Sequence, residues 1–110
     1  MALFIGIFLT SAPALAGPIS LLDCELGNAP VENASVSFYN GRFFLITRSY
    51  EGEVNSRIIP KEDWERRILL ILDTPEKKGV LYREDGSWYF HFKGDNGWLM
   101  KGNANCSDRG

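Results

Sequence analysis

The chain has 110 residues, of which 12 are basic and 14 acidic, so its formal net charge is −2 at pH 7. This near balance gives no electrostatic footprint for nucleic acid, and we expect no nucleic-acid partner. The length suffices for one small domain and not for two. Aromatic residues make up 13% of the chain, which suits a small core rich in β-strands.

Residues 1–16 have the pattern of an export signal peptide. An apolar run over residues 1–10 is followed by Ala14 and Ala16, which form the A-x-A pattern that signal peptidase recognises. A core strand and a membrane anchor are the alternatives, but the run is too short to span a bilayer. We therefore expect cleavage after Ala16, a periplasmic or secreted location, a single exported β-domain of residues 17–110, and no membrane span after cleavage.

Cys24 and Cys106 are the only cysteines in the chain. They lie near the two ends of the exported part, and thiols oxidise outside the cytosol, so we expect one disulfide bond between them. Two unpaired buried thiols are the alternative. The disulfide bond would tie the beginning of the domain to its end.

The dipeptide Asn40-Gly41 predicts a β-hairpin. It separates residues 34–39 from residues 42–48, and Asn-Gly readily adopts the positive φ angles of a two-residue hairpin loop. Pairing outward from this turn sets Val36 against Leu45. We expect that face to be the core.

Asp85-Gly86 predicts a second hairpin, between residues 80–84 and 87–92. The same pairing sets Leu81 against Phe90. The opposite face of this hairpin would carry Tyr82, Tyr89, His91 and Lys93.

Between the two hairpins, Pro60 and the acidic residues after it predict one short helical turn near Pro60–Arg67, with Trp64 packed inward. The apolar run of residues 68–72 is short and is bounded by turn formers. It therefore predicts a strand covered on both faces.

Further strands are expected at residues 19–26, 53–59 and 98–101, the last after a turn at residues 95–97. The predicted fold class is all-β. We expect a small antiparallel meander of about seven or eight strands that closes into a barrel or a sandwich, because closure removes exposed strand edges.

Few residues point to catalysis. His91 is the only histidine, and no Gly-x-Ser-x-Gly elbow accompanies it. There is no Cys/His cluster and no EF-hand spacing, so we predict neither a metal nor another cofactor. The pairs Glu62-Asp63 and Glu84-Asp85 have the carboxylates that glycoside cleavage requires, but acids are also favoured at a helix start and in a turn. We predict that the protein is not an enzyme.

One stretch resembles the C-terminal half of the periplasmic and membrane-bound inhibitors of c-type lysozyme, which are small exported β-barrels. The matching segments are Gly79-Val-Leu-Tyr82, Asp85-Gly86, Tyr89-Phe90 and Lys93-Gly94-Asp95. The family signature runs Ser-Gly-x-x-Tyr, a turn, an aromatic strand and Lys-Gly, and the cysteines near both ends are also similar to the family's frame.

The resemblance implies a binding function, because in that family the signature serine and the strand lysine bind the catalytic carboxylates of lysozyme. Lys93 and Tyr82 stand where the family has its lysine and tyrosine. Lys78 replaces the serine, and the turn is one residue longer. A cation at such a site pairs with acidic groups in a partly desolvated cleft.

The predicted function is an exported, non-catalytic binding module of the cell envelope. Its contact residues would be Lys93, Lys78 and Tyr82, and its protein partner, following the resemblance, a c-type lysozyme. Two alternatives stay open. One is an envelope structural or assembly protein, and the other is a small hydrolase that acts on glycans through carboxylates.

Overall fold

The computed structural model describes residues 17–109, which form nine strands and one short helix. The predicted export signal, residues 1–16, lies outside the described residues. Within the described part, no helix is both long enough and apolar enough to cross a membrane.

The strands form two antiparallel sheets. The five-stranded sheet has the order β4-β3-β2-β1-β9 and the four-stranded sheet the order β5-β6-β7-β8. The strands of the first sheet are β1 (Ile19–Glu25), β2 (Val31–Tyr39), β3 (Arg42–Ser49), β4 (Val54–Ile59) and β9 (Asn105–Asp108). Those of the second sheet are β5 (Ile68–Asp73), β6 (Lys77–Glu84), β7 (Ser87–Gly94) and β8 (Leu99–Asn103), and helix α1 (Lys61–Arg66) connects β4 to β5.

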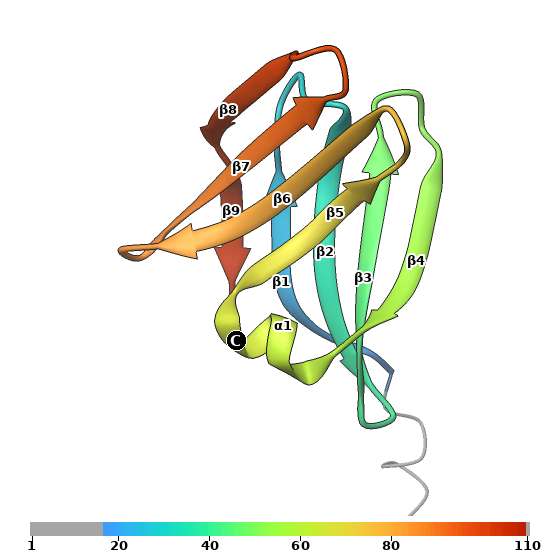
Figure 1. Cartoon of the computed structure of the whole chain (residues 1–110). Coiled ribbons are helices and arrows are strands. Elements are labelled where there is room, and N and C mark those ends of the chain that lie inside the picture. The colour runs from blue at the N-terminus through green and yellow to red at the C-terminus, as the bar shows by residue number, and fades with distance from the viewer. Residues whose placement is uncertain (1–16, 110) are drawn as a thin grey trace, which may run out of the picture.

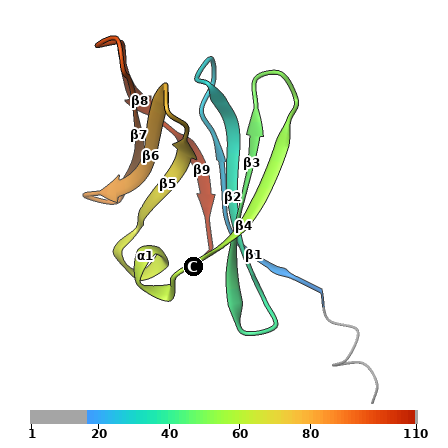
Figure 2. The same ribbon diagram turned by 45° about the vertical axis from the view of Figure 1, so that its right-hand side comes forward.

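The two sheets pack face to face as a sandwich (Figures 1 and 2). They do not close into a barrel, because β4 and β5 are edge strands that do not pair with each other. The all-β prediction is therefore confirmed in its sandwich form, and the barrel form is wrong.

Both predicted hairpin turns are present. Asn40 and Gly41 have φ angles of 54° and 77°, and Asp85 and Gly86 have φ angles of 53° and 82°. Positive φ at both central positions defines the turn whose twist suits a two-residue hairpin. The turns set the predicted register, in which Val36 pairs with Leu45 and Leu81 with Phe90.

The core lies between the sheets and is built mainly from alternate residues of β1, β2, β3, β5, β6 and β7. Its fully buried side chains include Leu22, Val36, Leu45, Leu69, Leu81 and Phe92. Burying a side chain of this size stabilises the fold by roughly 1.5–3 kcal/mol before entropy is counted. Polar residues alternate with these along most strands, so each sheet has one core face and one outer face.

Two glycines make room for aromatic rings of β7. A Cβ atom built on Gly79 would lie 2.5 Å from Cδ1 of Phe92, and one built on Gly102 would lie 2.7 Å from Cζ of Phe90. The registers place each glycine directly opposite the phenylalanine that covers it. Gly79 thus has a packing role in this fold.

The predicted helical turn is confirmed as α1. Trp64 is 5% exposed and packs into the core. Arg67 ends the helix with a φ of 56°, and its guanidinium carbon lies 3.9 Å from the centroid of the Trp64 ring. The chain passes from one sheet to the other at this point, with the indole as its anchor.

The cysteine pair forms the predicted disulfide bond. Cys24 in β1 and Cys106 in β9 are directly opposite each other, with their Cα atoms 4.0 Å apart. The bond therefore joins the first strand to the last within the five-stranded sheet. β9 itself was not predicted, because Asn105–Asp108 has no apolar alternation and is held by pairing with β1.

The prediction of a doubly covered strand at residues 68–72 is wrong in one respect. A strand forms there, but only one of its faces is covered. Leu69 and Ile71 are buried, whereas Ile68 is 48% exposed and Leu70 is 37% exposed. β5 is thus an apolar edge strand.

Candidate functional site

The outer face of β6, β7 and β8 carries three exposed lysines, which we call the lysine cluster: Lys78, Lys93 and Lys101. Lys78 and Lys93 are directly opposite each other in the ladder between β6 and β7. Lys101 lies in β8 opposite His91, one row further along the sheet. The structure therefore places both lysines predicted from the sequence on one face.

The alternation of the strands fixes this orientation. Gly79 and Leu81 in β6 and Phe92 in β7 are buried on the core face. Residues between them in sequence must point the other way, because successive side chains of a strand lie on opposite faces. The lysine positions are therefore set by the packing of the core.

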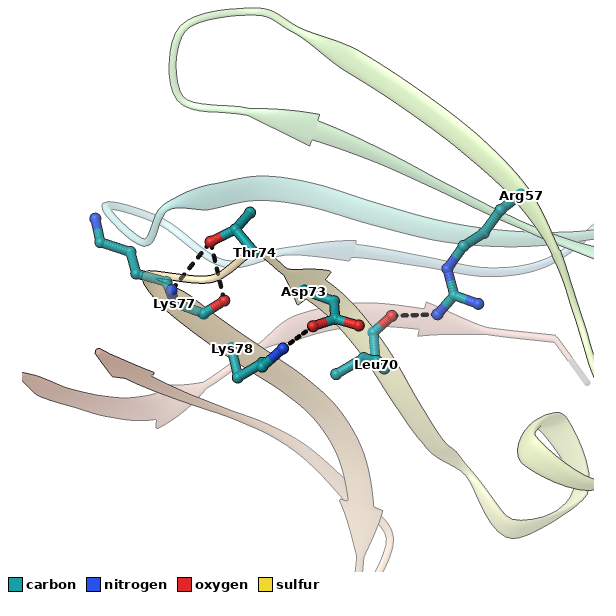
Figure 3. Close-up of polar contacts among 6 residues, drawn as sticks. All are labelled: Arg57, Leu70, Asp73, Thr74, Lys77 and Lys78. Carbon is teal, nitrogen blue, oxygen red and sulfur yellow. Dashed lines mark hydrogen bonds and ion pairs between the residues drawn. The ribbon is translucent and has the colours of Figure 1, made fainter. Parts of the chain in front are cut away.

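The electrostatics of the two predicted lysines differ. Like charges directly opposite each other in a sheet are destabilising. Lys78 is relieved by an ion pair with Asp73 of β5, which Figure 3 shows. Within the described residues, Lys93 makes no ion pair with an acidic side chain. Of the two predicted lysines, Lys93 is thus the one that is available for an outside partner.

Apolar and aromatic side chains lie on the same outer face, further along the strands from Lys78 and Lys93. Tyr82 is half-buried, pairs with Tyr89 across the ladder and has its ring centroid 5.7 Å from that of Tyr89. Ile68 pairs with Tyr82 from the other side. Tyrosine with a polar tip and an apolar body is a residue type enriched at protein interfaces. Tyr82 shares a face with both lysines but lies four residues along β6 from Lys78.

Lys101 was missed by the sequence reasoning. Its position could have been found by continuing the strand pairing across the turn at residues 95–97, because β8 keeps the register that places it opposite His91. His91 is half-buried on the same face, and within the described part of the chain its Nε2 atom has no hydrogen-bond partner.

The carboxylate pairs singled out from the sequence do not form a cleft. Asp63 in α1 makes an ion pair with Arg66 at 3.1 Å, and Glu84 and Asp85 lie exposed at the hairpin turn. Neither pair lines the cleft of about 370 Å³ that the structure contains between the edges of β4 and β5. Among the residues that the structure describes, no group of His, Cys, Asp and Glu is arranged to hold a metal ion.

No protein-family model, curated protein or solved structure matches the chain. Functional inference therefore depends on the geometry of the lysine cluster and of its surroundings.

Proposed function

We propose that the protein is an exported, non-catalytic binding module and that an acidic protein surface docks on the lysine cluster. The observation that carries this proposal is the direct opposition of Lys78 and Lys93 on an exposed sheet face. A cross-strand pair of like charges costs on the order of a few tenths of a kcal/mol. Natural proteins tend to keep an unfavourable arrangement of this kind, here two like charges directly opposite each other in a sheet, at functional sites.

An acidic partner would relieve this repulsion. A carboxylate that approaches Lys93 forms a charge-assisted hydrogen bond, and no acid of the described residues has to leave that lysine first. Lys78 would have to exchange Asp73 for the partner. We therefore assign the larger contribution to Lys93, with Tyr82 providing apolar contact further along the same face.

The partner that we propose is a lysozyme-like glycan hydrolase. Glycosidases of that kind carry two carboxyl groups in their active-site cleft, which is the charge that the lysine cluster complements. The resemblance to the inhibitors of c-type lysozyme supports this choice. The disulfide bond between Cys24 and Cys106 supports export to the compartment where such a hydrolase acts.

The test is to titrate the oxidised protein into a c-type lysozyme activity assay on bacterial cell walls. We expect inhibition by the wild type and at least about tenfold weaker inhibition by Lys93→Ala, because an interfacial charge contact is lost. Lys61→Ala is the matched control, since Lys61 is an exposed lysine of α1 away from the cluster. No inhibition at a micromolar excess of the wild type would exclude lysozyme as the partner.

A further inference from the structure

The sandwich is open on one side. On the other side the chain itself crosses from β8 to β9, where the Ala104 amide donates a hydrogen bond to the Trp88 carbonyl at 3.0 Å and the Trp88 indole donates one to Asp108, also at 3.0 Å. On the open side, β4 and β5 are both edge strands. Among the described residues, one side-chain hydrogen bond spans that side, from Nη2 of Arg57 in β4 to the carbonyl oxygen of Leu70 in β5 at 2.5 Å (Figure 3).

The cleft of about 370 Å³ lies on this open side and has an apolar floor and a polar mouth. Leu45 of β3 and Ile71 of β5 line it and are only 2% and 5% exposed. Thr47 and Asn55 line it from β3 and β4 and bring a hydroxyl and an amide. Such a lining suits a ligand that has apolar side chains and regularly placed polar groups.

The free edge of β5 offers main-chain polar groups with which the polar groups of a ligand can pair. The carbonyl of Leu70 points out of its sheet toward β4, since it accepts the hydrogen bond from Arg57. The exposed edge of a strand presents main-chain donors and acceptors that another strand can pair with. β5 is apolar from Ile68 to Leu72 and carries no charge or proline there. In the described part of the chain, the side chain of Arg57 covers this edge by its hydrogen bond to Leu70.

The opening between β4 and β5 is not closed by main-chain pairing. A strand inserted between β4 and β5 would separate them by two strand spacings, roughly 10 Å. The separation that exists is bridged by a long arginine side chain and not by main-chain pairing. The site already binds a main-chain carbonyl, so the same guanidinium can bind the carbonyl of an inserted strand.

The charged side chains that line the cleft do not favour a strongly charged ligand of either sign. Arg57, Glu53 and Asp73 line it, and Asp73 is paired with Lys78. Opposite charges are thus near balance, which favours the neutral main chain of a peptide over a strongly charged small molecule.

We propose that the cleft binds an extended peptide segment of another protein, which adds as a strand to the free edge of β5. Alternate apolar side chains of the peptide would lie on Leu45 and Ile71, and Arg57 would leave Leu70 for a peptide carbonyl. Main-chain hydrogen bonds give affinity in such strand addition, and the alternate side chains give specificity. The cleft touches the lysine cluster only through the ion pair of Asp73 with Lys78, and Lys93 does not line it. The proposal can therefore be tested independently of the proposed function.

The test is selection of binders from a library of random heptapeptides displayed on phage, with the oxidised wild-type protein as bait. We expect enriched sequences with apolar residues at alternate positions. The best peptide is then synthesised with a fluorescent label, and its affinity is measured by fluorescence anisotropy. N-methylation of the peptide main chain should weaken binding at every second residue only, because alternate N–H groups face the β5 edge.

Asn55→Trp should weaken binding of this peptide at least about tenfold by filling the mouth of the cleft. Val54→Trp is the matched control on the opposite face of β4, and Lys93→Ala is the control for the lysine cluster; neither should change the affinity. Asn55 and Val54 are both exposed, and thermal melts verify that both variants fold.

Three results would overturn the proposal. One is the absence of any enriched peptide. Another is equal affinity for the wild type and the folded Asn55→Trp variant, and a third is a dimer in analytical ultracentrifugation that Asn55→Trp abolishes, which would make a second copy of this chain the occupant.

Discussion

Removal of the disulfide bond between Cys24 and Cys106 should lower the free energy of unfolding by about 4–5 kcal/mol. The bond closes a loop with a sequence separation of 82 residues. In the chain-entropy model, a loop of that length restricts the unfolded chain by about this amount, since the cost grows with the logarithm of the loop length. A domain of this size has a total stability of about 5–14 kcal/mol, so the loss leaves it close to unfolding.

The structure also predicts where the loss appears first. β9 is the shortest strand, and in the five-stranded sheet it pairs with β1 alone. Without the disulfide bond, β9 should open before the rest of the sheet. Asp108 would then leave the indole of Trp88 and the guanidinium of Arg83, which it contacts at 3.0 Å and 3.7 Å. Amides of β9 should exchange with solvent faster than those of β6 and β7.

The assay is urea denaturation followed by tryptophan fluorescence, on the oxidised wild type, the reduced wild type and the double variant Cys24→Ala/Cys106→Ala. The reduced wild type separates the effect of the bond from the loss of sulfur packing, which matters because Cys24 is fully buried. A difference below about 1 kcal/mol between the oxidised and the reduced protein would refute the entropic reasoning. It would show that core packing and strand pairing suffice to hold the two ends together.

Three further substitutions test the packing of the four-stranded sheet and its contact with β9. Gly79→Ala should destabilise the fold by about 1–3 kcal/mol, because its methyl group would overlap the fully buried ring of Phe92; the combination with Phe92→Leu should recover part of the loss in a double-mutant cycle. Asp108→Ala should cost at least about 1 kcal/mol in urea denaturation, since the indole N–H of buried Trp88 loses its acceptor, and an unchanged midpoint would contradict that role. Gly86→Ala should lower stability by about 1 kcal/mol, because the residue has a φ of 82° and alanine is strained at a positive φ where glycine is not. A neutral effect in a thermal melt would argue against this turn geometry.

The hairpins were predictable because local chemistry decides them. Asn40-Gly41 and Asp85-Gly86 adopt positive φ cheaply, and the side-chain alternation on either side fixes which residues face the core. The register of both hairpins followed from the turn positions alone. Helix α1 was predictable for a similar reason, since Pro60 and the acids after it favour a helix start.

Features that depend on tertiary packing were not predictable. β9 has a polar sequence, and its strand conformation comes from pairing with β1 and from the disulfide bond between its Cys106 and Cys24 of β1. The exposed face of β5 looked buried because Ile68 and Leu70 are apolar, and only the arrangement of the sheets shows that this face is uncovered. The choice of an open sandwich over a barrel has the same origin, since it depends on whether two distant edges meet.

The candidate site was predictable in part. Placing Lys93 and Tyr82 on one face followed from the second hairpin. Including Lys78 required β6 to begin at Lys77, whereas the predicted strand of the second hairpin began at residue 80. The ion pair between Lys78 and Asp73 depends on the pairing of β5 with β6, for which the sequence has no hairpin dipeptide.

The most direct test of the proposed binding role is calorimetric titration of a c-type lysozyme with the wild type and with Lys93→Glu. This substitution sets an acid opposite Lys78, so the thermal stability of the protein should be unchanged or higher. Binding should nevertheless be lost, because the new carboxylate repels the acids of the partner. A wild type that binds and a folded Lys93→Glu variant that does not is the result we predict. Equal affinity of the two proteins, or no binding by either, would contradict it.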